Sequence, residues 1–130
     1  MVPPTFQDIV AAREFISPYL PKTPLVWIPT LSEELGCDYY AKLENLQPTG
    51  AFKVRGGVNL VGCEVRAGSG SNRATLVSAS TGNHGQSIAY AGRLFGARVI
   101  IYAPTKNVKR NEDAGDARPG RRSPFARLRF

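Results

Sequence analysis

The spacing of apolar residues divides the first 104 residues into short helices and strands. Thr5 and Asp8 form the pattern of a capping box, and the apolar positions behind them keep helical spacing to about Tyr19. Prolines at positions 18, 21 and 24 then prevent the helix from continuing. The chain that follows is expected to hold an extended piece over 24–29, a helix over 31–36 with Ser32 as N-cap and Gly36 as its end, and a strand over 38–44.

A longer helix is predicted from Phe52 to about Arg66, although it contains three glycines. Gly56, Gly57 and Gly62 each weaken a helix by ~1 kcal/mol relative to alanine. Glycines that persist on a helix suggest that another group approaches its backbone closely.

The next forty residues follow the order strand, helix, strand. The run ATLVSAS (74–80) has the length and composition of a buried strand, and RVIIYAP (98–104) has the same character. Between them, QSIAYAGRLFG predicts a helix that ends at Gly96 and presents one apolar face. That face is expected to hold Ile88, Ala91, Leu94 and Phe95. This order predicts a right-handed βαβ unit, and so an α/β fold with an open parallel sheet and flanking helices.

The composition describes one globular domain. The chain has 130 residues, of which 42% are hydrophobic and 21% charged. No apolar run approaches the ~20 residues of a membrane-spanning helix, and the start MVPPTFQDIV lacks the pattern of a secretory signal. Cys37 and Cys63 lack metal-ligand spacing and are expected to be free thiols. These features predict a cytoplasmic protein without a metal site or a membrane anchor.

Most of the positive charge lies in the C-terminal tail. The whole chain has a formal charge of +7. Residues 1–104 hold 9 basic and 7 acidic side chains, whereas residues 105–130 hold 8 basic and 3 acidic side chains. The tail shows no apolar periodicity, has five arginines in its last thirteen residues, and is interrupted by Pro119 and Pro124. By composition we expect 105–130 to be a basic tail of low order.

Lys53 is the first candidate for chemistry. In the stretch QPTGAFKVRGG (47–57) it follows a Pro-Thr-Gly turn and precedes two glycines within four residues. A lysine is most often a solvated surface charge, so this stretch alone leaves that interpretation open.

A second candidate region, SASTGNHGQS (78–87), lies where a predicted strand ends and a helix begins. Ligands of open α/β sheets bind at such places, and small residues there let an anion reach the free N–H groups at the helix start. A helix capped by Ser or Thr after a glycine turn is the plain alternative. One histidine does not by itself make a metal site or a catalytic dyad. The residues concerned are Ser80, Thr81, Gly82, Asn83 and His84.

The two stretches together resemble the fold-type II pyridoxal-phosphate enzymes. KLENLQPTGAFKVRGG and SASTGNHGQ, separated by 30 residues from Lys53 to Asn83, are closest to the threonine/serine dehydratase branch, which includes serine racemase. The resemblance runs from about Thr23 to Pro104. It implies that 1–104 is the N-terminal portion of a lyase domain, an N-terminal segment plus the start of the small lobe.

The resemblance also implies a role for each site residue. Lys53 would bond to the aldehyde carbon of pyridoxal 5'-phosphate and later remove the substrate's α-proton, for which it must be neutral. Phe52 would pack beside the pyridine ring, and Asn83 would hydrogen-bond the ring's phenolic oxygen. The loop Ser80–His84 would bind the carboxylate of a small amino acid, threonine or serine. Loss of the β-hydroxyl as water would then give a 2-oxo acid and ammonia.

Two positions favour one branch of this family. The synthase branches carry Asp after the lysine, whereas this chain has Val54, which favours a dehydratase or racemase. Racemases place a serine before Gly-Asn, where this chain has Thr81. We therefore expect a dehydratase, with serine racemase or another fold-type II enzyme as the alternative.

Parts of the family's pattern are missing from this sequence. Such enzymes need about 300 residues, or two domains of ~150, and no glycine-rich phosphate loop follows residue 105. Codons for Gly115–Ser123, read one base later, allow Ala-Met-Arg-Ala-Leu-Gly-Ala-Glu-Val, which resembles the family's continuation. The chain is therefore expected to be truncated and inactive, with an out-of-frame tail.

Two other functions stay open. The basic tail could bind nucleic acid, although no nucleic-acid motif accompanies it and aromatic residues appear only at Phe125 and Phe130. The chain could also associate with a full-length homologue, and a full-length protein could form a homo-oligomer. No sequence feature argues directly for either association.

Overall fold

The computed structural model describes residues 2–68, 75–104 and 125–129. The first helix, α1 (Phe6–Ile16), begins at the predicted capping box. Asp8 accepts a hydrogen bond from the Thr5 backbone N–H at 2.7 Å, and Thr5 Oγ1 accepts one from the Asp8 N–H at 3.2 Å. Two of the four unpaired N–H groups at the helix start are thereby satisfied.

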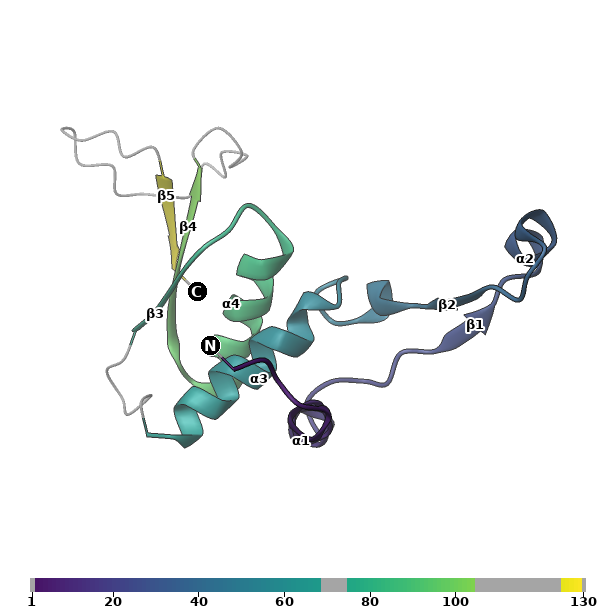
Figure 1. Cartoon of the computed structure of the whole chain (residues 1–130). Helices are drawn as coiled ribbons and strands as arrows, with labels where there is room; N and C mark the ends of the chain where they lie inside the picture. Colours follow the sequence, from purple (N-terminus) through teal and green to yellow (C-terminus); the bar gives the residue numbers. More distant parts are fainter. Residues whose placement is uncertain (1, 69–74, 105–124, 130) are drawn as a thin grey trace.

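A two-stranded arm follows α1. Strand β1 (Leu25–Trp27) pairs antiparallel with β2 (Tyr40–Lys42), with Val26 opposite Ala41, and helix α2 (Pro29–Leu35) joins them. A 3₁₀ turn, η1 (Glu44–Leu46), leads out of the arm. Figure 1 shows that the arm projects away from the rest of the chain. We call residues 24–43 the arm.

The predicted start of α2 is wrong by one turn. The helix begins at Pro29 with Ile28 as its N-cap, since proline suits the first helical position, where an N–H would be unpaired. Ser32 lies inside the helix, donates to the Ile28 carbonyl and accepts from the Tyr39 N–H, both at 2.9 Å. Gly36 ends the helix with φ +65°, as predicted.

The arm exposes a large apolar surface. All three residues of β1 are exposed, so both faces of that strand carry uncovered apolar side chains. A two-stranded hairpin of this size has little stability by itself. Within the described ranges the exposed large apolar side chains of the arm are Leu25, Val26, Trp27, Leu31, Leu35, Tyr39 and Tyr40.

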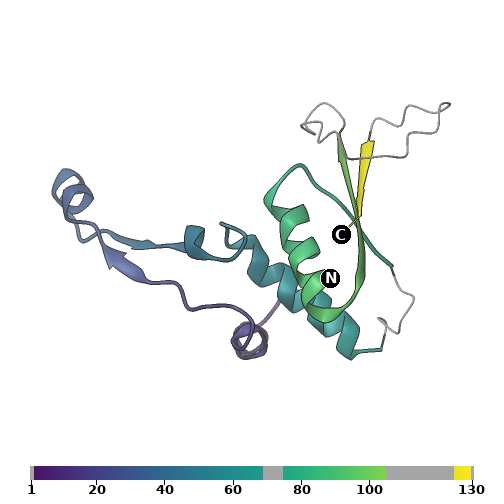
Figure 2. The same cartoon turned by 180° about the vertical axis from the view of Figure 1, so that it is seen from behind.

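The body of the molecule packs two helices against a sheet. Helix α3 (Lys53–Arg66) is followed by β3 (Thr75–Ala79), α4 (Asn83–Phe95) and β4 (Arg98–Pro104). Strands β3 and β4 are parallel, with Val77 opposite Ile100, which confirms the predicted strand–helix–strand unit. Seen from behind, α3 and α4 lie on one side of the sheet (Figure 2).

The end of the chain contains a strand that the apolar pattern did not predict. Strand β5 (Phe125–Arg129) pairs antiparallel with β4, with Tyr102 opposite Arg127, so the sheet order is β3-β4-β5. The remainder of the predicted basic tail, residues 105–124 and 130, lies outside the described residues.

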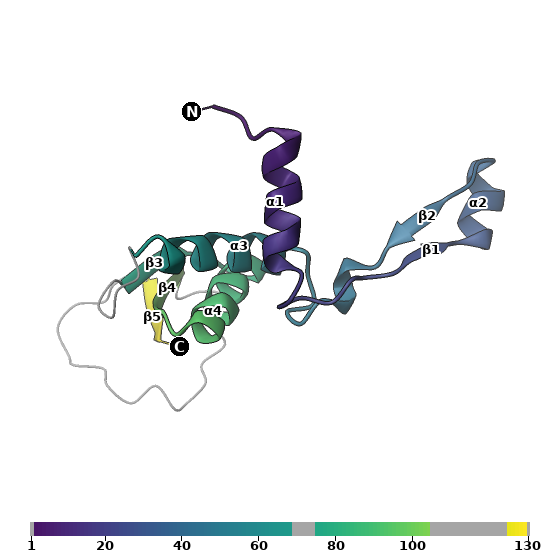
Figure 3. The ribbon, with the colours of Figure 1, turned by 90° about the horizontal axis from the view of Figure 1, so that it is seen from below.

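Valines of α3 form the centre of the core. Val54, Val58 and Val61 are fully buried, and α1 runs across α3 and adds Ile16 (Figure 3). Ile88 and Ala91 of α4 complete the contact, as predicted, but Leu94 is 39% exposed. The predicted place of Leu94 was wrong because it lies outside the i, i+3, i+4, i+7 stripe that starts at Ile88.

None of the described helices is long and apolar enough to cross a membrane.

Candidate active site

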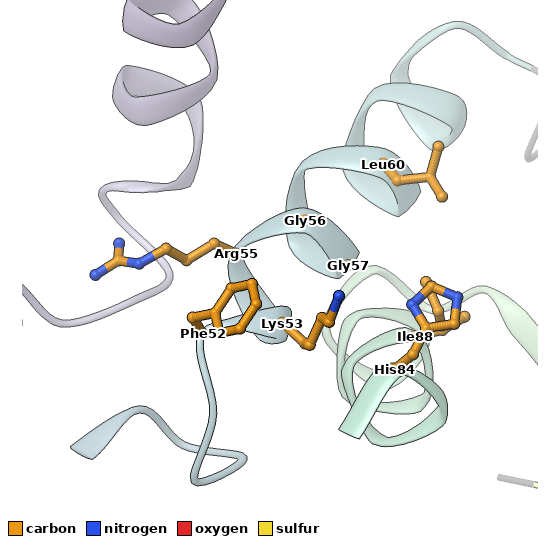
Figure 4. Close-up of a pocket in the computed structure, with 8 residues that line it drawn as sticks. All are labelled: Phe52, Lys53, Arg55, Gly56, Gly57, Leu60, His84 and Ile88. Atoms are coloured by element: carbon orange, nitrogen blue, oxygen red, sulfur yellow. The ribbon is translucent and has the colours of Figure 1, made fainter. Parts of the chain in front are cut away.

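Lys53 is the first residue of α3 and lies directly after a tight turn. Gly50 has φ +67° and donates its N–H to the Gln47 carbonyl at 2.7 Å, which closes the predicted turn. Phe52 is the N-cap of α3, and its ring centroid lies 5.0 Å from the Lys53 Nζ. At this distance the ring face attracts the positive charge of the ammonium group. Figure 4 shows the lysine pointing from α3 towards the start of α4.

Lys53 lines a pocket of about 380 Å³ between α3 and α4. Lys53 and His84 lie at the starts of the two helices and give the pocket its amine and its imidazole (Figure 4). Leu60 and Ile88 lie further along the same helices and add apolar surface to the pocket. The remaining lining residues are Phe52, Arg55, Gly56 and Gly57.

A close helix contact holds the two sides of the pocket together. A Cβ atom at Gly57 would lie 2.6 Å from the Ser87 backbone oxygen, so the absence of a side chain lets α3 approach α4. Lys53 lies one turn before Gly57, and His84 lies one turn before Ser87. The two helix starts therefore lie next to each other because this glycine permits it.

The Ser80–His84 loop is organised by its first residue. Ser80 Oγ accepts hydrogen bonds from the N–H groups of Gly82 at 3.1 Å and Gly85 at 2.8 Å, so this hydroxyl serves the loop itself. Helix α4 begins at Asn83. Among the described residues none accepts a hydrogen bond from the N–H of Asn83 or His84, which leaves two donors for an anion.

The structure brings part of the predicted site together. Phe52, Lys53 and His84 line one pocket. Asn83 is the neighbour of His84 in α4 but is not one of the pocket's lining residues. Ser80, Thr81 and Gly82 do not line it either, and they precede α4 in the adjoining loop. The roles of all these residues stay predictions.

A polar cluster near the pocket was not predicted from the sequence. The Arg55 guanidinium binds the Glu44 carboxylate through two hydrogen bonds, Nε to Oε2 and Nη2 to Oε1, each 2.8 Å long. Thr23 Oγ1 donates to the same carboxylate, and Lys42 Nζ donates to the Thr23 carbonyl. Figure 4 shows the Arg55 side chain directed away from Lys53. Arg55 of α3 therefore binds the two residues that flank the arm, Thr23 before it and Glu44 after it.

This cluster shifts the titration of its acidic member. The hydrogen bonds from Arg55 lower the pKa of Glu44 from its ordinary value of 4.5 to about 2, against an opposing effect of burial, with a further contribution from Thr23. The same pair raises the pKa of Arg55. A carboxylate bound in this bidentate manner stays ionised over the whole physiological range.

Replacing Glu44 with glutamine tests this cluster through its pH dependence. The folded-state pKa lies below the ordinary value, so the stabilisation is present above pH 4.5 and is lost as the pH falls towards 2. The side chains are 33% (Arg55) and 21% (Glu44) exposed. Because water screens such a pair, we expect a loss of only about 1 kcal/mol. Urea unfolding at pH 7 and pH 2.5 measures it.

Glu33→Gln is the matched control, since Glu33 is exposed on α2 and makes no ion pair within the described ranges. A cost of Glu44→Gln that is the same at both pH values would contradict the assignment.

The comparisons with known proteins identify the family. The family model described as "Pyridoxal-phosphate dependent enzyme" matches residues 16–117. The chain therefore belongs to the family of pyridoxal-phosphate-dependent enzymes.

Relatives within this family have more than one named activity. The L-threonine ammonia-lyase of Thermotoga maritima is 34% identical over 115 residues, which are 85% of this chain and 28% of that protein. A serine racemase of Dictyostelium discoideum is 36% identical over 115 residues, which are 85% of this chain and 34% of the racemase. A solved pyridoxal 5'-phosphate-dependent aspartate racemase is 33% identical with a TM-score of 0.76, over 83% of this chain and 35% of that one. The chain thus spans about a third or less of these relatives.

The residues of the pocket fit one end of the family's cofactor. An aldehyde needs a primary amine, and Lys53 presents one to an open pocket with an aromatic ring beside it. The free N–H groups at the start of α4 fit a carboxylate. The phosphate group would need a nest of N–H donors, and the pocket's lining residues include no such loop. The described residues therefore fit the aldehyde end of the cofactor and the carboxylate of a substrate, but they do not provide a site for the phosphate group.

Proposed function

We propose that this chain carries the lysine-bearing part of a pyridoxal-phosphate-dependent ammonia-lyase that acts on small hydroxy amino acids, threonine or serine. The observation that carries the proposal is the Lys53 amine, which faces a pocket shared with His84 at the start of α4. The relatives that include threonine ammonia-lyases support the same reaction class.

Each residue has a definite task in this proposal. With pyridoxal phosphate bound, Lys53 Nζ would hold the aldehyde carbon, and the free amine would take the proton from the substrate's α-carbon. Phe52, whose ring lies beside the Lys53 amine, would pack against the cofactor ring, and the Asn83 amide would be the donor to the ring oxygen. The N–H groups of Asn83 and His84 hold the substrate carboxylate next to the Lys53 amine. Pyridoxal phosphate supplies, when bound, the electron-accepting ring that stabilises negative charge at the α-carbon.

The overall reaction follows from loss of the β-hydroxyl. Abstraction of the α-proton and departure of the hydroxyl as water leave an unsaturated amine, which hydrolyses to a 2-oxo acid and ammonia. Lys53 and the His84 imidazole can both donate hydrogen bonds to the carboxylate of an amino-acid substrate. Leu60 and Ile88 add apolar surface to the same pocket.

Racemisation is the second candidate, because several relatives are named serine or aspartate racemases. It requires a proton donor on the opposite face of the substrate, and the resemblance to the family implies that Thr81 stands where the racemases have a serine. Incubation with L-serine distinguishes the two reactions, since elimination releases ammonia whereas racemisation produces D-serine alone.

A labelling experiment tests the proposal on the chain itself. Pyridoxal phosphate is added, the carbon–nitrogen double bond is reduced with borohydride, and the labelled lysine is found by peptide mass spectrometry. We expect the label on Lys53 in preference to Lys22 and Lys42, which lie outside the pocket. Equal labelling of the three lysines would contradict the proposal.

A further inference from the structure

Gly56 occupies an exposed position in α3 that helix packing does not explain. A Cβ atom at Gly57 would lie 2.6 Å from the Ser87 oxygen, and one at Gly62 would lie 2.5 Å from the Phe15 Cζ. A Cβ atom at Gly56 would meet nothing within 4 Å, and Gly56 does not have a positive φ. Packing therefore accounts for the other two glycines of α3. Gly56 weakens the helix by about 1 kcal/mol relative to alanine, and no close contact in the described residues requires a glycine there.

The open space at Gly56 belongs to the Lys53 pocket. Gly56 lines the pocket together with Lys53, three residues before it, and Leu60, four residues after it. Residues with this spacing share one face of a helix. Figure 4 shows bare helix at Gly56, between the Lys53 and Leu60 side chains. A side chain at position 56 would therefore enter the volume next to the Lys53 amine.

We infer that Gly56 is a specificity-determining position, which keeps the space beside the Lys53 amine free for a ring-bearing aldehyde. This inference rests on the proposed function, because it assumes that an aldehyde reacts with Lys53. A small aldehyde reaches the amine without that space, whereas a molecule with a ring needs it. Position 56 thus sets the size of the compound that Lys53 accepts and leaves the reactivity of the amine unchanged.

Two substitutions of different size test the inference against two aldehydes. Gly56→Ala and Gly56→Leu both introduce better helix formers than glycine, so neither is expected to lower the melting temperature. The probes are pyridoxal phosphate and formaldehyde, each followed by borohydride reduction and mapping of the label on Lys53. We expect Gly56→Leu to reduce pyridoxal-phosphate labelling roughly tenfold or more and Gly56→Ala to reduce it less. Labelling by formaldehyde should not change.

Cys63→Leu provides the matched control. Cys63 is exposed, lies seven residues after Gly56 on the same face of α3, and does not line the pocket. We expect this variant to be labelled like the unmodified chain by both aldehydes.

The possible failures are distinguishable. Equal pyridoxal-phosphate labelling of Lys53 in the unmodified chain and in Gly56→Leu would overturn the inference and leave the proposed function intact. An equal fall with both aldehydes, or a lower melting temperature of Gly56→Ala, would overturn it in favour of a structural role for the glycine. If the unmodified chain shows no preference for Lys53, the proposed function fails, and the inference fails with it.

Discussion

Replacement of Lys53 with alanine is expected to abolish the covalent adduct between this chain and pyridoxal phosphate. Of the residues that line the pocket, Lys53 alone carries a primary amine. An aldehyde can form a carbon–nitrogen double bond with such an amine and with no other side chain there. The absorbance of the adduct and the mass increase after borohydride reduction should both fall to the background that the remaining lysines produce.

Lys53→Arg separates reactivity from charge. A guanidinium keeps the positive charge beside Phe52 but stays protonated and cannot form the bond, so this variant should also lose the adduct. Lys22→Ala is the control, since Lys22 is exposed and lies outside the pocket, and it should retain full labelling. An adduct that survives in Lys53→Ala, or one that disappears in Lys22→Ala, would refute the site.

Gly57→Ala is expected to destabilise the body of the molecule by about 2 kcal/mol, within the usual range for overpacking. The added methyl group would meet the backbone oxygen and carbon of Ser87 at 2.6 and 2.8 Å. Backbone atoms cannot rotate away as a side chain can, so α3 and α4 must separate. Urea unfolding measures the cost.

The neighbouring glycine provides the comparison of opposite sign. Gly56→Ala adds the same methyl group to the same helix where nothing lies within 4 Å, and it should stabilise the chain by up to about 1 kcal/mol. Equal unfolding midpoints for the two variants would show that the close approach of α3 to α4 is not needed for stability.

Local patterns in the sequence predicted the elements whose signals are local. The capping box of α1 and the Gly36 terminus of α2 follow from residues within a few positions of one another. The parallel pair β3–β4 follows from the order of strand, helix and strand, each of which has its own local pattern. The start of α2 was mispredicted because Ser32 was taken as the N-cap, whereas Pro29 suits the first helical position and starts the helix earlier without a side-chain cap.

The features that sequence analysis missed depend on contacts between distant residues. Arg55 reaches Glu44 across 11 positions and Thr23 across 32, and no periodicity encodes such a meeting. The apolar lining of the pocket was missed for the same reason, since Leu60 and Ile88 come from different helices. The glycines of α3 gave a partial signal, because Gly57 and Gly62 mark where a neighbour comes close to the helix, whereas the same expectation was wrong for Gly56.

The exposed arm affects how this polypeptide behaves in solution. Strand β1 is apolar on both faces, and the outer edges of β1 and β2 have no partner strand within the described ranges. Such an edge is a template for hydrogen bonding with a second chain. Concentrated preparations of this polypeptide would consequently tend towards intermolecular β-structure that starts at the arm.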